Sequence, residues 1–139
     1  MTTDPDCIFC KIVAGQMPCF KLFEDDDTLA FMDIYPANAG HCLVIAKDHY
    51  PTLFEISNKA LAAVSRSISR VARAVNQALS PAGLNLVQAN GSGAGQSVTH
   101  FHFHILPRER GDELKLNWGA KPGNPDTIAA IADKIRANL

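Results

Sequence analysis

Residues 99–108 read Thr-His-Phe-His-Phe-His-Ile-Leu-Pro-Arg, so that three of the chain's five histidines fall within five residues. Side chains of a β-strand point alternately to its two faces. The period of two therefore places His100, His102 and His104 on one face of a predicted strand and apolar residues on the other. A helix would scatter these side chains around its circumference, and Pro107 would soon end it. The imidazole face of this strand must meet a metal, a substrate or solvent.

The composition is that of an ordinary globular domain. The chain has 139 residues, of which 47% are hydrophobic and 19% charged, enough for one domain with a core. The net charge of −1 gives no support for binding to nucleic acids or to acidic membranes. No signal-peptide core and no apolar run near the ~20 residues of a membrane span are visible, which predicts a cytoplasmic protein. The four cysteines are then expected to be thiols or metal ligands rather than disulfides.

The order of apolar and turn residues predicts a single α+β domain over residues 1–139, with a mostly antiparallel sheet of about five strands. Apolar residues at spacings of three and four indicate one long helix over residues 57–79, with Ser57 as its N-cap and with Pro81 and Gly83 after it as the residues that stop it. A C-terminal helix is expected from Asn124, which is followed by proline and an acid in favoured places. The remaining expected elements are a short helical segment at 8–13 and strands at 20–24, 28–33, 41–46, 84–89 and 98–106.

A glycine-rich loop, residues 90–96, leads directly into the histidine stretch. It is not a dinucleotide fingerprint, because a strand follows it, and it lacks the Gly-Lys-Ser/Thr of a P-loop. Taken alone it indicates a flexible hairpin loop. Beside the histidines, its backbone N–H groups and the Ser97 hydroxyl suit an anionic phosphate. Clustered imidazoles can bind Zn²⁺ or attack phosphorus, and these neighbouring donors favour phosphorus chemistry.

The run from Gly95 to Leu106 resembles the signature of the histidine triad (HIT) family, in which histidines alternate with apolar residues. Residues 7–12, 29–34 and 40–47 resemble the family's N-terminal segment and nucleotide-binding strands, in the same order and spacing. The resemblance implies the HIT fold and a homodimer whose sheets join across a two-fold axis. It also implies a hydrolase or transferase that acts on a purine nucleotide. The substrate would be a nucleoside phosphoramidate or a dinucleoside polyphosphate, cleaved at the α-phosphate through a nucleotidyl-histidine intermediate.

The same resemblance implies roles for the polar residues of the catalytic centre. His102 corresponds to the nucleophile that takes the nucleotidyl group. His104 and His41 correspond to the histidines that contact the phosphate and manage protons. Ser97 corresponds to a hydroxyl of the phosphate cradle.

Further residues would bind the nucleotide. Gly95 and Gln96 resemble the backbone part of the phosphate cradle, Asp33 the carboxylate that accepts the ribose hydroxyls, and Asn90 a polar ligand contact. Four apolar residues resemble the slot for the base and would otherwise be ordinary core residues: Ile8, Phe9, Ile12 and Phe31.

The N-terminal segment carries a lone C-x₂-C motif, Cys7 and Cys10. Reduced thiols without a metal are one interpretation. A bacterial-type subset of the HIT family has a structural zinc site at this place, and the resemblance supplies His49 and His100 as the other two ligands. His100 would then be structural and His102 catalytic, although both lie on the same face.

Two questions stay open at the level of sequence. Residues 114–123 carry the only tryptophan, Trp118, which is either a packing anchor or, as in dimeric relatives, a residue that helps the partner's site to select the leaving group.

The chain could also be a nucleotide-binding regulatory module with little turnover. A metalloenzyme in which His100, His102 and His104 hold a catalytic metal is the second rival.

Overall fold

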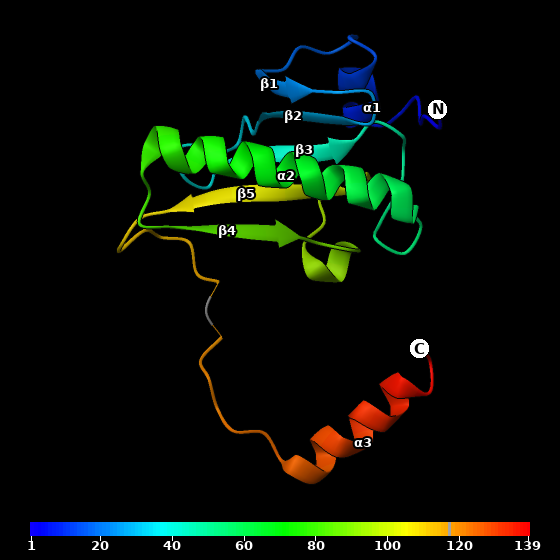
Figure 1. The fold of residues 1–139 in the computed structure, drawn as a ribbon, viewed down its shortest axis with the longest axis vertical. Helices are drawn as coiled ribbons and strands as arrows, with labels where there is room; N and C mark the ends of the chain where they lie inside the picture. Colours follow the sequence, from blue (N-terminus) through cyan, green and yellow to red (C-terminus); the bar gives the residue numbers. More distant parts are fainter. Residues whose placement is uncertain (117) are drawn as a thin grey trace.

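The computed structural model describes residues 1–116 and 118–139, and its centre is a five-stranded antiparallel sheet (Figure 1). Its strands follow the order β1-β2-β3-β5-β4, so that β5 pairs with both β3 and β4. The histidine strand β5 therefore lies inside the sheet, next to β3, the strand that follows His41. The predicted α+β fold is confirmed. The strands are β1 (Lys21–Glu24), β2 (Thr28–Met32), β3 (Cys42–Ala46), β4 (Gly83–Gln88) and β5 (His102–Arg108).

Helices cover the two faces of the sheet differently (Figure 1). Helix α2 (Asn58–Leu79) packs on one face against Ala30, Val44 and Ile105. The short helix α1 (Ile8–Val13) packs on the other face, where Leu29 and Leu43 lie. Alternate residues of β2 and β3 thus enter opposite cores, which explains why both strands are apolar throughout.

The long helix has the predicted extent, since α2 ends at Leu79. Ser57 is its N-cap, and the Ser57 side chain accepts a hydrogen bond from the backbone N–H of Ala60. The C-cap is Ser80, in the left-handed conformation with φ of 45°, and Pro81 and Gly83 follow it, with Gly83 as the first residue of β4. The sequence did not single out Ser80, because glycine adopts this conformation most easily.

The histidine strand starts later than predicted, at His102 rather than at residue 98. The preceding residues turn, because the N–H of His100 donates to the carbonyl of Val98 and the N–H of Phe101 to that of Tyr50. The predicted division into faces is nevertheless correct. Phe101 lies in the core under α2, while His100 and His102 contact Phe9 of α1.

The C-terminal helix α3 (Pro125–Arg136) has the predicted start, since the side chain of Asn124 accepts a hydrogen bond from the N–H of Thr127. It lies apart from the sheet (Figure 1), and none of its residues is buried. Its predicted apolar face, which includes Ile128 and Ile131, is therefore exposed in this chain. Among the described residues, no helix is both long enough and apolar enough to cross a lipid bilayer.

Candidate active site

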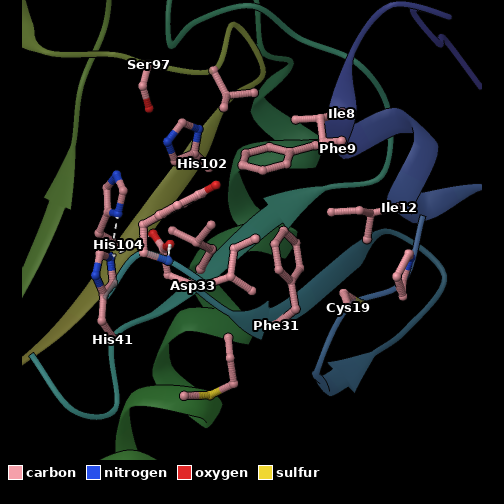
Figure 2. A pocket seen from close by; sticks show the side chains of 16 residues that line it. Ile8, Phe9, Ile12, Cys19, Phe31, Asp33, His41, Ser97, His102 and His104 are labelled. Carbon is pink, nitrogen blue, oxygen red and sulfur yellow. Dashed lines mark hydrogen bonds and ion pairs between the residues drawn. The ribbon is translucent and has the colours of Figure 1, made fainter. Parts of the chain in front are cut away.

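A cavity of about 410 Å³ opens on the α1 side of the sheet, beside β5 (Figure 2). This volume is within the range that small-molecule sites occupy. The histidines gather at one end of the cavity and the apolar side chains at the other. Nine residues predicted from the sequence line it: Ile8, Phe9, Ile12, Phe31, Asp33, His41, Ser97, His102 and His104.

The apolar end is shaped by the ring of Phe9. This ring packs edge-to-face on Phe31, with 5.4 Å between ring centroids, and on His102, with 5.2 Å. Leu43 belongs to the same apolar cluster and also lines the cavity. Such a slot, built of aromatic and aliphatic side chains, suits a flat ring such as a nucleobase.

The environment of His102 determines which ring nitrogen carries the proton. Its Nδ1 lies 2.5 Å from the backbone carbonyl oxygen of His100. A carbonyl only accepts, so the proton is on Nδ1 and the lone pair is on Nε2. Burial lowers the pKa of His102, which keeps the ring neutral. His102 is thus a neutral imidazole with a free nitrogen at the cavity.

His41 and His104 form a relay that starts at the backbone. The N–H of Ala37 donates to Nδ1 of His41 over 3.0 Å. The proton of neutral His41 must then sit on Nε2, which lies 2.8 Å from Nδ1 of His104. His104 accepts there and therefore carries its own proton on Nε2. The relay therefore ends at the Nε2–H group of His104, beside His102. The centroids of the His102 and His104 rings are 4.9 Å apart.

Both relay histidines are neutral at physiological pH. Burial, together with repulsion from His102 and His41, lowers the pKa of His104 to about 4. Burial also lowers the pKa of His41, although Asp33 opposes this shift with its carboxylate 3.4 Å away.

Asp33, His41 and His104 bring three potential metal-ligating atoms within 4.8 Å of one another. The hydrogen bond from Ala37 speaks against a metal there. It occupies the lone pair of His41 Nδ1 and leaves the proton on Nε2, the atom that faces Asp33 and His104. A metal ligand needs a lone pair, which this nitrogen lacks. The cluster is better described as a hydrogen-bonded relay.

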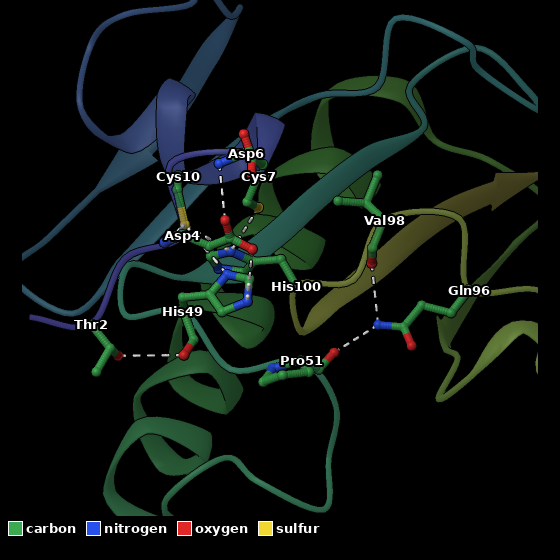
Figure 3. Close-up of polar contacts among 10 residues, drawn as sticks. All are labelled: Thr2, Asp4, Asp6, Cys7, Cys10, His49, Pro51, Gln96, Val98 and His100. Atoms are coloured by element: carbon green, nitrogen blue, oxygen red, sulfur yellow. Dashed lines mark hydrogen bonds and ion pairs between the residues drawn. The ribbon is translucent and has the colours of Figure 1, made fainter.

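A second cluster joins Cys7, Cys10, His49 and His100 (Figure 3). His100 Nδ1 lies 3.5 Å from Cys7 Sγ and 3.6 Å from Cys10 Sγ, and His49 Nδ1 lies 3.4 Å from Cys10 Sγ. Ligands of tetrahedral zinc, with bonds of about 2.3 Å to sulfur and ~2.0 Å to nitrogen, are separated by roughly 3.5 Å. The four side chains therefore already have the spacing of a zinc site.

The surroundings of the cluster also fit a zinc ion. His100 Nε2 donates to the carbonyl of Ala46 over 2.7 Å, which leaves the lone pair on Nδ1, toward the cysteines. Burial lowers the pKa of His100 to about 4, so the ring is neutral as a ligand must be. His49 Nε2 faces a carboxylate oxygen of Asp4 at 3.9 Å. His100 thus turns toward the cysteines, and the three strand histidines do not converge on one metal.

The chain was compared with known proteins. A family model described as the HIT domain matches residues 14–111. The chain belongs to the HIT family. Adenosine 5'-monophosphoramidase hnt1 of Schizosaccharomyces pombe is 39% identical over 134 residues, which cover 96% of this chain and 98% of that protein. Adenylylsulfatase HINT3 of Arabidopsis thaliana is 42% identical over 113 residues, which cover 81% of this chain and 57% of that protein.

Solved structures share the fold of this chain. SMU.412c of Streptococcus mutans matches with a TM-score of 0.93 and 38% identity, covering 98% of this chain and 87% of that chain. A Zn-bound histidine triad family protein of Mycobacterium smegmatis matches with a TM-score of 0.74 and 34% identity, covering 95% of this chain and 97% of that chain. The HIT-like fold predicted from the sequence is therefore correct.

Three residues that the HIT resemblance assigned to ligand binding are not among the lining residues of the cavity. The Gln96 side chain accepts from the N–H of Gly91 and donates to the carbonyl of Pro51. Asn90 exchanges hydrogen bonds with Gln88, and Gly95 ends a short 3-10 helix with φ of 84°. These residues shape the loop before Ser97, and their direct contact with a nucleotide stays a prediction.

The cavity also contains residues that the sequence reasoning missed. Pro18 and Cys19 line its apolar end, and Ile34 and Tyr35 line it near Asp33. Tyr35 is exposed and follows the carboxylate residue in a turn, so that no periodic pattern marked it. Trp118 lies outside the cavity and is 91% exposed, so it is not a packing anchor within this chain.

Proposed function

We propose that this HIT protein is a hydrolase or transferase that cleaves purine nucleoside phosphoramidates or dinucleoside polyphosphates at the α-phosphate. The observation that carries the proposal is the neutral His102 with its lone pair on Nε2, at the edge of a nucleoside-sized cavity. This nitrogen attacks the α-phosphorus, the bond from that phosphorus to the amine or to the remaining polyphosphate breaks, and a nucleotidyl-histidine forms as the leaving group departs. Water then releases the nucleoside monophosphate.

The other groups of the cavity bind and orient the nucleotide. The base lies in the apolar slot that Phe9 and Phe31 line, and the carboxylate of Asp33 accepts the ribose hydroxyls. His104, held by His41, donates from Nε2 to the phosphate or to the leaving group. The Ser97 hydroxyl donates to the phosphate. Two relatives named as an adenosine 5'-monophosphoramidase and an adenylylsulfatase support this chemistry.

The test is a substrate panel of adenosine phosphoramidates, adenylates and dinucleoside polyphosphates, run with the purified full-length protein. We expect release of AMP from at least one class, without a requirement for added metal. Tight nucleotide binding with no turnover of any class would instead indicate a regulatory nucleotide-binding module.

We infer that Cys7, Cys10, His49 and His100 bind one structural Zn²⁺, which would place the chain in the zinc-containing bacterial subset of the family. The support is the spacing of the four donor atoms, together with the Zn-bound relative. Four protein ligands leave no open position for a reactive water, so the ion would supply a structural link and no catalytic step.

We also infer a homodimer of single-domain chains, each spanning residues 1–139. The support is that β4 ends the sheet as an edge strand and that α3 exposes its apolar face. None of the four cysteines, all of which lie in the described part of the chain, forms a disulfide, which fits the reducing cytoplasm.

Trp118 provides a test of leaving-group selection. If Trp118 reaches the partner's site, Trp118→Ala changes the ratio of kcat/KM between bulky and small leaving groups and leaves hydrolysis of the smallest nearly intact. Trp118→Phe, which keeps an aromatic ring, serves as the matched control. Because the side chain is 91% exposed, we expect no change in Tm. A uniform loss across substrates with a lower Tm would assign Trp118 a structural role.

The pKa values of the relay predict the pH dependence of turnover. We expect kcat/KM, which reports the groups of the free enzyme, to begin to fall only below the pH at which an exposed histidine with a pKa near ~6.5 would be half charged. It should then fall toward the pKa of His104, about 4. The direction follows from the sign of the shift: burial favours neutral His104 and His41, so only stronger acid protonates them and breaks their hydrogen bond. A pH series of kcat/KM checks this, and a value that still rises toward about pH 5 would contradict it.

A further inference from the structure

The loop between β2 and β3 carries three groups of the active site: the Asp33 carboxylate, the Ala37 N–H and the His41 ring. Within the loop, the N–H of Asp33 donates to the carbonyl of His41, and the N–H of His41 to the carbonyl of Asn38, each over 3.1 Å. These bonds close the loop on itself. They do not attach it to the strand that carries His102 and His104.

Besides the hydrogen bond between His41 and His104 itself, the side chain of Asn38 makes that attachment. Asn38 Nδ2 donates to the backbone carbonyl of Pro107 and to Oδ2 of Asp112, both over 2.9 Å. Pro107 belongs to β5, the strand of His102 and His104, and Asp112 lies in the turn that follows it. Asn38 therefore ties the loop with His41 to the strand with His104.

Asp112 is itself held in a fixed position. Arg108, also on β5, donates to both its carboxylate oxygens, from Nε over 2.7 Å and from Nη2 over 2.6 Å. The N–H of Glu109 donates to the same carboxylate over 3.1 Å. Arg108 further donates from Nη1 to Asn85 of β4 over 2.9 Å. A bidentate pair with this many supports is rigid, and its carboxylate side chain is 9% exposed.

We propose that Asn38 and Asp112 are positioning residues: they hold the Ala37 N–H against His41 and so decide which nitrogen of His41 and His104 carries the proton. Asn38 follows Ala37 directly, so its two hydrogen bonds fix the orientation of the peptide groups around it. The kinetic consequence rests on the function proposed above, whereas the consequence for the protons does not.

The physical reason is that each neutral imidazole carries a single proton, which sits on either Nδ1 or Nε2. If Ala37 moves away, His41 is free to carry its proton on Nδ1, and its Nε2 then offers a lone pair. That lone pair faces the lone pair on Nδ1 of His104, 2.8 Å away. His104 relieves the repulsion by moving its proton to Nδ1, which removes the N–H group from the cavity.

The decisive experiment is ¹⁵N NMR of the histidine rings at pH 7.5, on the full chain with its metal. In the wild type we expect His41 and His104 each to show one tautomer, with the proton on Nε2. Asn38→Ala and Asp112→Asn should mix the tautomers of both rings. Asn38→Asp, which is nearly isosteric and sets a carboxylate against Asp112, serves as a second variant if Asn38→Ala does not fold.

Kinetics provide the second measurement. With the best substrate, kcat should fall about tenfold in these variants, because a relay displaced by a fraction of an ångström loses alignment. KM should change by less than about threefold, since the backbone N–H of Asp33 keeps its hydrogen bond to the His41 carbonyl and so holds Asp33 in place. Asp133→Asn is the matched control. It removes a carboxylate 2.5 Å from Arg136 on exposed α3, and it should alter neither kcat nor the spectrum.

Two outcomes separate the possibilities. Wild-type tautomers and an unchanged kcat, even with a lower Tm, would overturn the proposal and leave Asn38 and Asp112 as stabilising residues only. If the wild type turned over no substrate, the proposed function would fail, and the ¹⁵N spectra alone would still decide the positioning role.

Discussion

Replacing His102 by alanine should lower kcat/KM by about 10⁴-fold or more, because neither of the other two histidines that line the described cavity has a free lone pair with which to attack. The relay geometry gives the reason. The lone pair of His104 is on Nδ1, engaged by His41, and that of His41 is on Nδ1, engaged by Ala37. Among the three histidines that line the described cavity, only His102 has a ring nitrogen whose lone pair is free. Nucleotide affinity should change little, since Asp33 and the apolar slot remain.

His102→Asn is the matched variant for this experiment. Its side-chain amide can still donate to the carbonyl of His100, so that the local hydrogen bond survives while the nucleophile is lost. Both variants should bind AMP with wild-type affinity by calorimetry and show no burst of nucleotidyl-enzyme. Near-normal turnover of an active substrate by either variant would refute the mechanism.

Loss of the zinc site is the second large effect that we expect. Purified protein should contain about one zinc per chain, and Cys7→Ser or Cys10→Ser should lower Tm by about 10 °C or more, because closed sites of this kind contribute to folding. Burial raises the pKa of the Cys10 thiol, so zinc binding must displace a proton and should weaken in acid.

Cys19→Ser is the control for the zinc experiment, because Cys19 is half-buried and lies outside the four-residue cluster. It should keep both the metal and the wild-type Tm. The zinc variants should also bind nucleotide more weakly, since Cys7 and Cys10 flank Phe9, which packs on His102. If the purified protein contained no zinc and both cysteine variants kept the wild-type Tm, Cys7 and Cys10 would be ordinary thiols and the zinc site would be refuted.

Features that depend on neighbouring residues were predictable from the sequence. The period of two assigned His102 and Phe101 to opposite faces, and the N-caps Ser57 and Asn124 lie where local side-chain chemistry predicts them. The start of β5 was not predictable, because the turn before it is held by the carbonyl of Tyr50, which lies 51 positions before Phe101 in the sequence. No local pattern reports such a bond.

The candidate site likewise has features that the sequence indicates and features that only the folded chain determines. The resemblance to a family assigned roles to the histidines, but it did not indicate which nitrogen of each ring carries the proton. That property depends on the Ala46 carbonyl for His100 and on the Ala37 N–H for His41, both brought in by the fold. Asn38 and Asp112 are separated by 74 positions, and neither belongs to a motif.

The place of β5 between β3 and β4 has a consequence for the motions of the protein. A strand bonded on both sides exchanges its amide hydrogens only when most of the sheet opens, so β5, together with β2 and β3, should be among the slowest-exchanging segments of the described chain. His102, the proposed nucleophile, would therefore be carried by one of the least mobile parts of the backbone. Ligands must reach it through fluctuations of α1 and of the loops around the cavity, and hydrogen exchange with bound nucleotide should slow there while β5 stays unchanged.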